Sequence, residues 1–196
     1  MKRTFCLLAL AASLLATAGA AKADPFVFTT ILTGASEVPP TASAGVGNAV
    51  VTINGNFMTV TVSFSGLSGN TTASHIHCCA PEGTNAMVAT TTPTFPGFPL
   101  GVTSGFYSQT FDLTLASSYN PAFITAHGGT VAQAEADLLA GIMGRQTYLN
   151  IHTNLFPGGE IRGQLQIVPE PAALVLLVTG LAGAAVHRRR RRQSRA

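Results

Sequence analysis

The segment NAVVTINGNFMTVTVSF, residues 48–64, constrains the fold of this chain most strongly. It holds two runs of apolar and β-branched residues on either side of Asn54-Gly55, and Asn-Gly is the strongest short-range signal for a hairpin turn. In the second run, apolar residues alternate with hydroxyl residues; the apolar set is Met58, Val60, Val62 and Phe64. Alternation with period two indicates a strand with one buried face. The sequence therefore predicts a β-hairpin here.

Further strands are predicted at residues 26–33, 106–115 and 160–167, which turn residues separate at short intervals. Residues 90–101 form a Pro- and Gly-rich loop that cannot be a central strand. In residues 160–167 alternation predicts an inward set (Ile161, Gly163, Leu165 and Ile167) and an outward set (Arg162, Gln164 and Gln166). Glu160 and Arg162 share a face two residues apart, which predicts a local ion pair or a contact at the rim of the sheet. The whole pattern is typical of an all-β sandwich or barrel.

One segment departs from the β pattern. Its apolar residues recur at helical spacing, and they are Val131, Ala134, Leu138 and Ile142. Thr130 and Gln133 fit a capping box, and Gly144 fits a stop signal. We therefore expect one short helix over about 130–142, packed over an end or edge of the β structure.

Residues 1–23 have the pattern of a helical secretory signal peptide. Lys2 and Arg3 precede an apolar run, and Ala21-Lys22-Ala23 provides a small-x-small cleavage site. Cleavage there leaves Asp24 as the first residue of a mature domain over 24–168; a cut after Ala20 and an uncleaved anchor are the alternatives. The domain is therefore expected outside the cytoplasm.

Residues 169–196 consist of three consecutive parts: Pro169-Glu170-Pro171, an uncharged run at 172–186, and a basic tail. The tail contains Arg188, Arg189, Arg190, Arg191 and Arg192. A helix over 172–186 would cover about 22 Å of a hydrocarbon core about 30 Å thick, which makes it a marginal membrane segment. The arginines favour the cytoplasmic side for the tail and the outer side for the domain.

This arrangement resembles the PEP-CTERM sorting signal of Gram-negative bacteria. The resemblance implies transient insertion of residues 172–186 in the inner membrane, recognition by an exosortase-type sorting enzyme, and removal of the tail. It also implies delivery to the cell surface or the extracellular matrix.

The charge of the mature domain differs in sign from that of the whole chain. The chain carries a formal charge of +3, but residues 24–168 contain only Arg145 and Arg162 against seven acidic residues, a net charge of −5. A domain of this charge gives no support to nucleic-acid binding. The segment also contains no Gly-rich phosphate loop, G-x-S-x-G or H-E-x-x-H motif, so no catalytic set is predicted.

Three histidines form a candidate metal site. His75 and His77 lie two residues apart, so they share one face of a strand. His152, just before the final predicted strand, is the candidate third ligand of a copper or zinc ion. The alternative is a group of polar side chains that satisfy backbone groups near strand ends.

Cys78 and Cys79 are the cysteines that remain once Cys6 leaves with the signal peptide. Thiols outside the cytoplasm tend to oxidise. A vicinal disulfide, two free thiols packed as small apolar groups, and an intermolecular bridge are all consistent with the sequence. A four-ligand site using all of 75–79 is disfavoured because the side chains point to opposite faces.

Three blocks within residues 26–167 resemble the signature blocks of the CHRD domain, named after chordin. They are LTGASEVPPTASAGVGNAVVTI, ASHIHCCAPEG and YLNIHTNLFPGGEIRGQL. The resemblance implies an immunoglobulin-like or superoxide-dismutase-like Greek-key sandwich or barrel without established enzymatic activity. Dismutases use an H-x-H strand in their copper site, which points to His75 and His77, with His152 as the third ligand. Their zinc loop has no counterpart here.

The sequence thus predicts a non-enzymatic, exported CHRD protein with a binding or structural role at the cell envelope or in the matrix. The alternative is an extracytoplasmic protein that binds copper or zinc through the histidines. No residue pattern names an extracellular ligand.

Overall fold

The predicted hairpin is formed by β2 (Val46–Asn54) and β3 (Phe57–Ser65), which pair antiparallel from Val46↔Ser65 to Asn54↔Phe57. Gly55, in the turn, has a φ of +57°, the left-handed conformation that a tight hairpin turn requires and that glycine adopts readily. The computed structural model describes residues 25–169, 179–184, 188 and 193.

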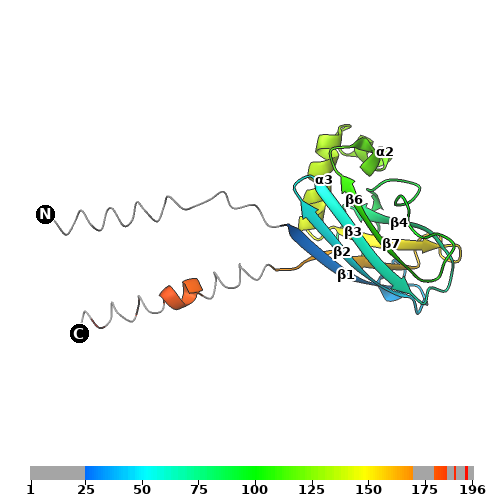
Figure 1. Ribbon diagram of the computed structural model, residues 1–196, viewed down its shortest axis with the longest axis horizontal. Coiled ribbons are helices and arrows are strands. Elements are labelled where there is room, and N and C mark those ends of the chain that lie inside the picture. Colours follow the sequence, from blue (N-terminus) through cyan, green and yellow to red (C-terminus); the bar gives the residue numbers. More distant parts are fainter. Residues whose placement is uncertain (1–24, 170–178, 185–187, 189–192, 194–196) are drawn as a thin grey trace.

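Nine strands of the described residues form one antiparallel sheet in the order β5-β4-β7-β8-β1-β2-β3-β6, with β9 paired to β1. The remaining strands are β1 (Phe26–Thr33), β4 (Thr71–Cys78), β5 (Met87–Val88), β6 (Gly105–Asp112), β7 (Thr147–Thr153), β8 (Ile161–Gln164) and β9 (Gln166–Ile167). Figure 1 shows β1, β2, β3 and β6 side by side across one face of a curled sheet, with β4 and β7 behind them. The predicted all-β class is confirmed.

The concave side of the sheet holds the hydrophobic core. The alternating residues predicted to face inward in β3, Met58, Val60, Val62 and Phe64, are all buried there. The loop at 90–101 is no central strand, as expected, but it contributes Phe95 and Phe98 to the same core. Two short 3-10 helices are present: η1 (Gly34–Ser36) lies between β1 and β2, and η2 (Ala116–Ser118) follows β6.

The predicted helix is α3 (Val131–Met143), and it buries Ala134, Leu138 and Ile142 as the spacing indicates. The Thr130 hydroxyl accepts a hydrogen bond from the Gln133 backbone amide, but the Gln133 side chain donates to Asp137 rather than closing the capping box. The expectation of a single helix was wrong. A second, α2 (Pro121–Ala126), packs beside α3 at one end of the sheet (Figure 1).

The start of α2 follows ordinary capping rules. The Asn120 side chain accepts a hydrogen bond from the amide of Ala122, and Pro121 occupies the first turn, where its missing N–H costs nothing. The Asn-Pro signal was present in the sequence, but the helix is six residues long and shows no periodicity to detect.

Three expectations for residues 160–167 were wrong. Arg162, predicted to point outward to solvent, is 4 % exposed, because the segment around Ser36 and Asn85 covers that face of β8. Ile167, predicted to be buried, is 46 % exposed because it lies on the short strand β9, which pairs with β1 beyond the core. Glu160 and Arg162 also form no ion pair with each other, since each is bound to different partners described below.

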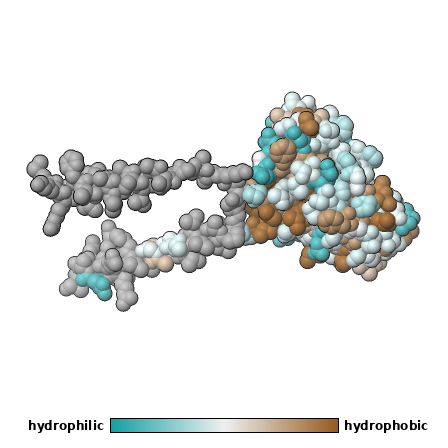
Figure 2. Space-filling view, in the orientation of Figure 1, coloured by the Kyte–Doolittle hydropathy of each residue, from teal (hydrophilic) through white to brown (hydrophobic). Residues whose placement is uncertain are grey.

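Several predicted features lie partly or wholly outside the described residues: the signal peptide over 1–23, Glu170, Pro171, Arg189–Arg192 and most of 172–186. Within the described ones, residues 179–184 are helical, and Pro169 and Arg188 are exposed. No helix in the described part of the chain has the length and apolar character needed to cross a membrane. Figure 2 shows apolar surface gathered over the end of the sheet where β1 begins.

Candidate metal centre

The pairing of β4 with β7 brings the three histidines together. In the register His75 lies opposite Asn150, His77 opposite Tyr148, and Ala73 opposite His152. Residues two apart share a face, so these side chains lie on one side of the sheet while Ile76, Leu149 and Ile151 fill the core on the other. Two strands that are distant in sequence thus present one polar layer, which the alternation along each strand alone could not reveal.

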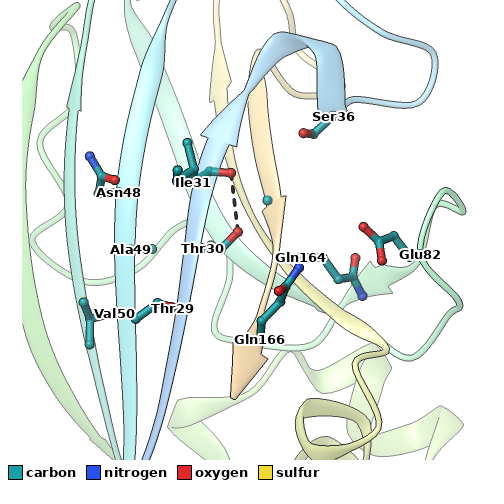
Figure 3. A pocket seen from close by; sticks show the side chains of 11 residues that line it. Thr29, Thr30, Ile31, Ser36, Asn48, Ala49, Val50, Glu82, Gln164 and Gln166 are labelled. Carbon is teal, nitrogen blue, oxygen red and sulfur yellow. Dashed lines mark hydrogen bonds between the residues drawn. The ribbon is translucent and has the colours of Figure 1, made fainter. Parts of the chain in front are cut away.

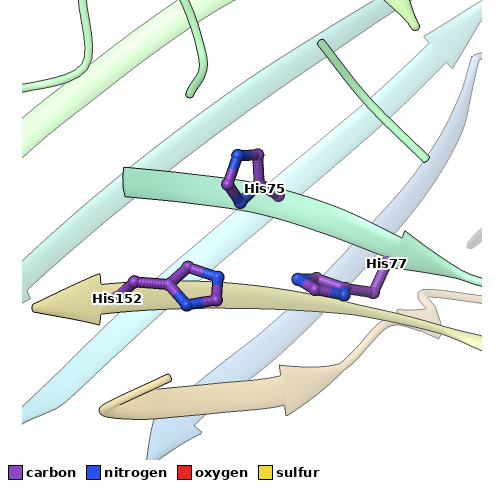
Figure 4. Close-up of side chains that lie close together, drawn as sticks. All are labelled: His75, His77 and His152. Carbon is purple, nitrogen blue, oxygen red and sulfur yellow. The ribbon is translucent and has the colours of Figure 1, made fainter. Parts of the chain in front are cut away.

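The three imidazole rings point toward a common space, as Figure 4 shows. Their centroids are 5.3 Å (His75–His152), 5.7 Å (His77–His152) and 6.0 Å (His75–His77) apart. One ring nitrogen from each residue lies within 4.8 Å of the others. His75 and His77 are only 6 % and 7 % exposed. The structure therefore forms a cluster of three imidazoles, two buried and one half-buried, with converging nitrogens.

Each imidazole uses its other nitrogen to bind a backbone carbonyl. His75 Nε2 lies 2.8 Å from the Pro93 oxygen, His77 Nδ1 2.9 Å from the Ala86 oxygen, and His152 Nδ1 2.9 Å from the Pro157 oxygen. Because a carbonyl only accepts, these nitrogens carry the protons. The opposite nitrogens, His75 Nδ1, His77 Nε2 and His152 Nε2, are buried without a hydrogen-bond partner. Each therefore presents an unused lone pair.

Burial lowers the pKa of all three imidazoles. For His75 and His77 the pKa falls from 6.5 to about 4, with burial the largest cause and neighbouring positive imidazoles a further one. The pKa of His152 is also lowered by burial, against an opposing bond to the Pro157 carbonyl. The cluster is therefore neutral at pH 7, which is the form of imidazole that binds metal ions.

This donor set fits copper or zinc. Metal-bound histidines almost always donate their second N–H to a carbonyl or carboxylate, as all three do here. Metal–nitrogen bonds of about 2.0–2.1 Å in tetrahedral geometry place ligand nitrogens about 3.4 Å apart. Nitrogens up to 4.8 Å apart would have to approach one another by up to about 1.4 Å to bind one ion. The three histidines would supply three ligands to such an ion, which would leave a fourth position for water or another ligand.

Tyr148 packs against the His77 ring, and Arg162 packs against Tyr148. The His77 and Tyr148 rings stack at 4.7 Å and 9°, and the Arg162 guanidinium lies over the Tyr148 ring, 4.4 Å from its centroid. The Tyr148 hydroxyl accepts a hydrogen bond from the Ala86 amide, in the segment whose carbonyl orients His77. His77 therefore has both its ring plane and its tautomer set by neighbours.

The polar layer extends to Glu37, Asn150 and Arg162, and no local pattern in the sequence predicts this role for them. The Glu37 carboxyl is 5 % exposed, and Asn150 Nδ2 donates to its Oε2 at 3.5 Å. Arg162 donates through Nε to the Ser36 carbonyl and through Nη1 to Asn85. Arg162 is one of two arginines in residues 24–168, and that scarcity was the available signal.

Glu160 ties together the loops beside the cluster. Its fully buried carboxylate accepts hydrogen bonds from the Ser43 and Thr153 hydroxyls and from the Ser68 and Gly69 amides. Burial alone would raise its pKa, but these bonds together lower it. The carboxylate is therefore a structural anchor for the end of β7, next to His152.

Cys78 and Cys79 form a disulfide bond in the structure. Cys78 lies in the hydrophobic core, and both sulfur atoms pack against Gly141 of α3. The disulfide thus lies on the opposite side of β4 from the histidines and takes no part in their cluster.

Comparison with known families gives two matches. The CHRD domain model matches residues 28–165, and the PEP-CTERM protein-sorting motif matches residues 168–192. No curated protein and no solved structure matches the chain. Neither of the two families is an enzyme family. The three sequence blocks that resembled the CHRD domain contribute Glu37, His75 and His77, and His152 and Arg162 to the polar layer. Since the first match covers more than half of the sequence, the chain belongs to the CHRD domain family and carries a PEP-CTERM protein-sorting motif at its C-terminal end.

Proposed function

We propose that this protein is a non-enzymatic, exported metal-binding protein whose CHRD domain holds one copper or zinc ion through His75, His77 and His152. One observation supports the proposal above all others: three buried imidazole nitrogens converge, and none has a hydrogen-bond partner. A buried polar atom without a partner costs about 1–3 kcal/mol. Three such atoms in one place are costly, and a metal ion bound between them would remove that cost.

The sorting motif gives the setting in which the site acts. A PEP-CTERM motif marks a bacterial protein for export and for sorting to the cell envelope or surface, with recognition by exosortase. We propose the Gram-negative cell surface or matrix as the destination, and metal binding at the surface or in the matrix as the role.

Metal analysis of the purified exported domain tests the metal site. Protein made without a histidine tag, dialysed against copper or zinc and then passed through a desalting column, should retain one equivalent per chain. The His77→Ala variant should retain about none. His127→Ala is the matched control, because His127 is paired with Asp137 outside the cluster and its loss should leave the stoichiometry at one. Equal and negligible metal in all three proteins contradicts the proposal.

A second candidate role is adhesion to a hydroxylated matrix polymer, which a groove on the outer side of the sheet favours. The groove measures about 530 Å³, and Figure 3 shows the amide side chains of Asn48, Gln164 and Gln166 among those that line it. Neutral amides and the hydroxyls of Thr29, Thr30 and Ser36 can donate to and accept from sugar hydroxyls. None of the three histidines lines this groove.

Co-sedimentation with extracellular polysaccharide from the host bacterium tests adhesion separately from metal binding. The wild-type domain should sediment with the polymer, and a Gln164→Ala/Gln166→Ala variant should not. His77→Ala should sediment like the wild type. Wild-type domain that stays in the supernatant contradicts the adhesion role.

A further inference from the structure

We propose that Glu37 is a proton-carrying partner of the three-histidine site: it holds a proton when the site is empty and releases it when a divalent cation binds. The inference rests on the metal-binding function proposed above. It assigns a role to a buried acid that this function alone does not explain.

A single side chain, that of Asn150, connects Glu37 to the three-histidine cluster. Asn150 donates to Glu37 Oε2, and Asn150 is both the cross-strand partner of His75 and the residue two before His152 on the same face. Directly opposed residues on neighbouring strands have Cβ atoms about 5 Å apart. The carboxyl is thus close enough to the site to sense a cation, and the cluster does not include it as a ligand.

The hydrogen bonds around Glu37 suit a protonated carboxyl better than a carboxylate. Arg162 Nε lies 3.9 Å from Glu37 Oε2, whereas a charge-assisted bond measures about 2.8 Å. Arg162 instead directs its donors to the Ser36 carbonyl at 2.6 Å and to Asn85 Oδ1 at 2.7 Å. The Arg162 guanidinium therefore donates its hydrogen bonds to neutral acceptors and not to the Glu37 carboxyl.

Two acceptor oxygens also meet beside Gly159 without a donor. Glu37 Oε1 and Asn150 Oδ1 are both buried and unpartnered. A Cβ atom on Gly159 would lie 2.7 Å from the first and 2.6 Å from the second, so the two oxygens face the same small space. A proton on the carboxyl would supply the missing donor. Burial, offset in part by Arg162 and Asn150, raises the Glu37 pKa to about 7.

Metal binding changes the charge balance of this face. With neutral histidines, the charged group that faces Glu37 is Arg162 of β8; His75 of β4 and His152 of β7 lie beyond Asn150, and Glu160 is bound on its other side by Ser43 and Ser68. A divalent cation adds two positive charges near Arg162. Loss of the Glu37 proton returns one negative charge, so bound metal makes the buried carboxylate favourable at pH values below 7, where the metal-free domain keeps the proton.

Zinc titration calorimetry of the exported domain tests the coupling. Titrations at each pH are repeated in buffers of different ionisation enthalpy, which gives the number of protons released per zinc. At pH 6 the wild type should release about one proton, and the number should fall toward zero by about pH 8. Below pH 7 the apparent association constant should fall about tenfold per pH unit. Glu37→Gln should bind zinc with almost no release, and Glu82→Gln, an exposed carboxylate exchange, should match the wild type.

The outcomes separate this inference from the function on which it rests. Wild-type protein that binds one zinc without proton release at pH 6, or a Glu37→Gln variant that releases as many protons as the wild type, overturns the role of Glu37 and leaves the metal site standing. Release that grows above pH 7 also overturns it, because that trend belongs to a metal-bound water. If the wild type binds no zinc, both the proposed metal site and the proposed role of Glu37 are contradicted. If Glu37→Gln fails to fold, the pH dependence of proton release by the wild type still tests the role of Glu37.

Discussion

Replacing His77 by phenylalanine should stabilise the metal-free domain and abolish its response to metal. The phenyl ring keeps the stacking position over Tyr148, now 4.7 Å between centroids, and places its extra carbon atoms toward the space between the three imidazoles. It removes the buried, unpartnered Nε2 of His77. The substitution also removes the Nδ1 group that donates to the Ala86 carbonyl. That carbonyl still accepts a hydrogen bond from the Tyr148 hydroxyl at 3.4 Å.

The magnitude follows from these losses and gains. An unsatisfied buried polar atom costs about 1–3 kcal/mol, and a lost hydrogen bond about 1 kcal/mol. The net gain for His77→Phe in metal-free buffer is therefore about 1 kcal/mol, or about 3 °C in melting temperature for a domain of this size. At a metal concentration 100 times its Kd the wild type gains about 2.7 kcal/mol, so the order of stability reverses.

Urea denaturation of both proteins, with chelator and then with zinc, measures the two differences. The expected result is a higher midpoint for His77→Phe with chelator and a higher midpoint for the wild type with zinc. Phenylalanine that destabilises the domain with chelator by more than 1 kcal/mol would refute the reasoning, because His77 would then be retained for packing. A zinc-induced shift of equal size in both proteins would refute it too.

Three other changes follow from the same structure. Glu160→Gln should lower the free energy of unfolding at pH 7 by about 2–3 kcal/mol. The carboxylate accepts four hydrogen bonds, and the NH2 group of the glutamine would face some of those donors. Glu82→Gln, at an exposed position, should change the urea midpoint little. Since the folded pKa of Glu160 is lowered, this carboxylate stabilises above about pH 4.5, and the difference between variant and wild type should shrink as the pH falls below that value. Gly141→Ala should cost at least about 2 kcal/mol in thermal melts, because a Cβ atom there overlaps the Cys78 sulfur and lies 2.9 Å from that of Cys79; an unchanged melting temperature would show that α3 can shift. The metal-free Glu37→Gln variant, which lacks the opposing titration of the Glu37 carboxyl with its pKa of about 7, should lose up to about 2 kcal/mol of unfolding free energy for each of His75 and His77 between pH 7 and pH 5. The unfolded chain binds protons in this range, and the folded His75 and His77, with pKa values of about 4, do not; a urea midpoint of this variant that is flat over this range would contradict their burial.

Local patterns were enough to predict much of the fold. The Asn54-Gly55 turn and the alternation of residues 57–64 gave β2, β3 and their inward face, and the spacing from Val131 to Ile142 gave α3. The helix α2 was missed because six residues show no helical period. Arg162 was placed in solvent because alternation along one strand distinguishes its two faces without showing whether a distant loop covers the second.

The site could be predicted only in part for the same reason. The H-x-H spacing shows that His75 and His77 share a face, and His152 was identified as a third candidate ligand. Convergence depends on the β4–β7 register, which brings Asn150 opposite His75. Glu37 reaches this layer from 113 residues away in sequence, and no local pattern encodes such a contact. The unpartnered nitrogens become visible only when the carbonyls of Pro93, Ala86 and Pro157 are in place.

Crystals of the exported domain soaked in zinc or copper, with data collected at the metal absorption edge, test the central claim most directly. We predict one anomalous peak per chain at about 2.0–2.1 Å from His75 Nδ1, His77 Nε2 and His152 Nε2, with the other nitrogens still bound to their carbonyls. A soaked crystal with no peak between these three nitrogens, or with its peak at His127 instead, would contradict the account.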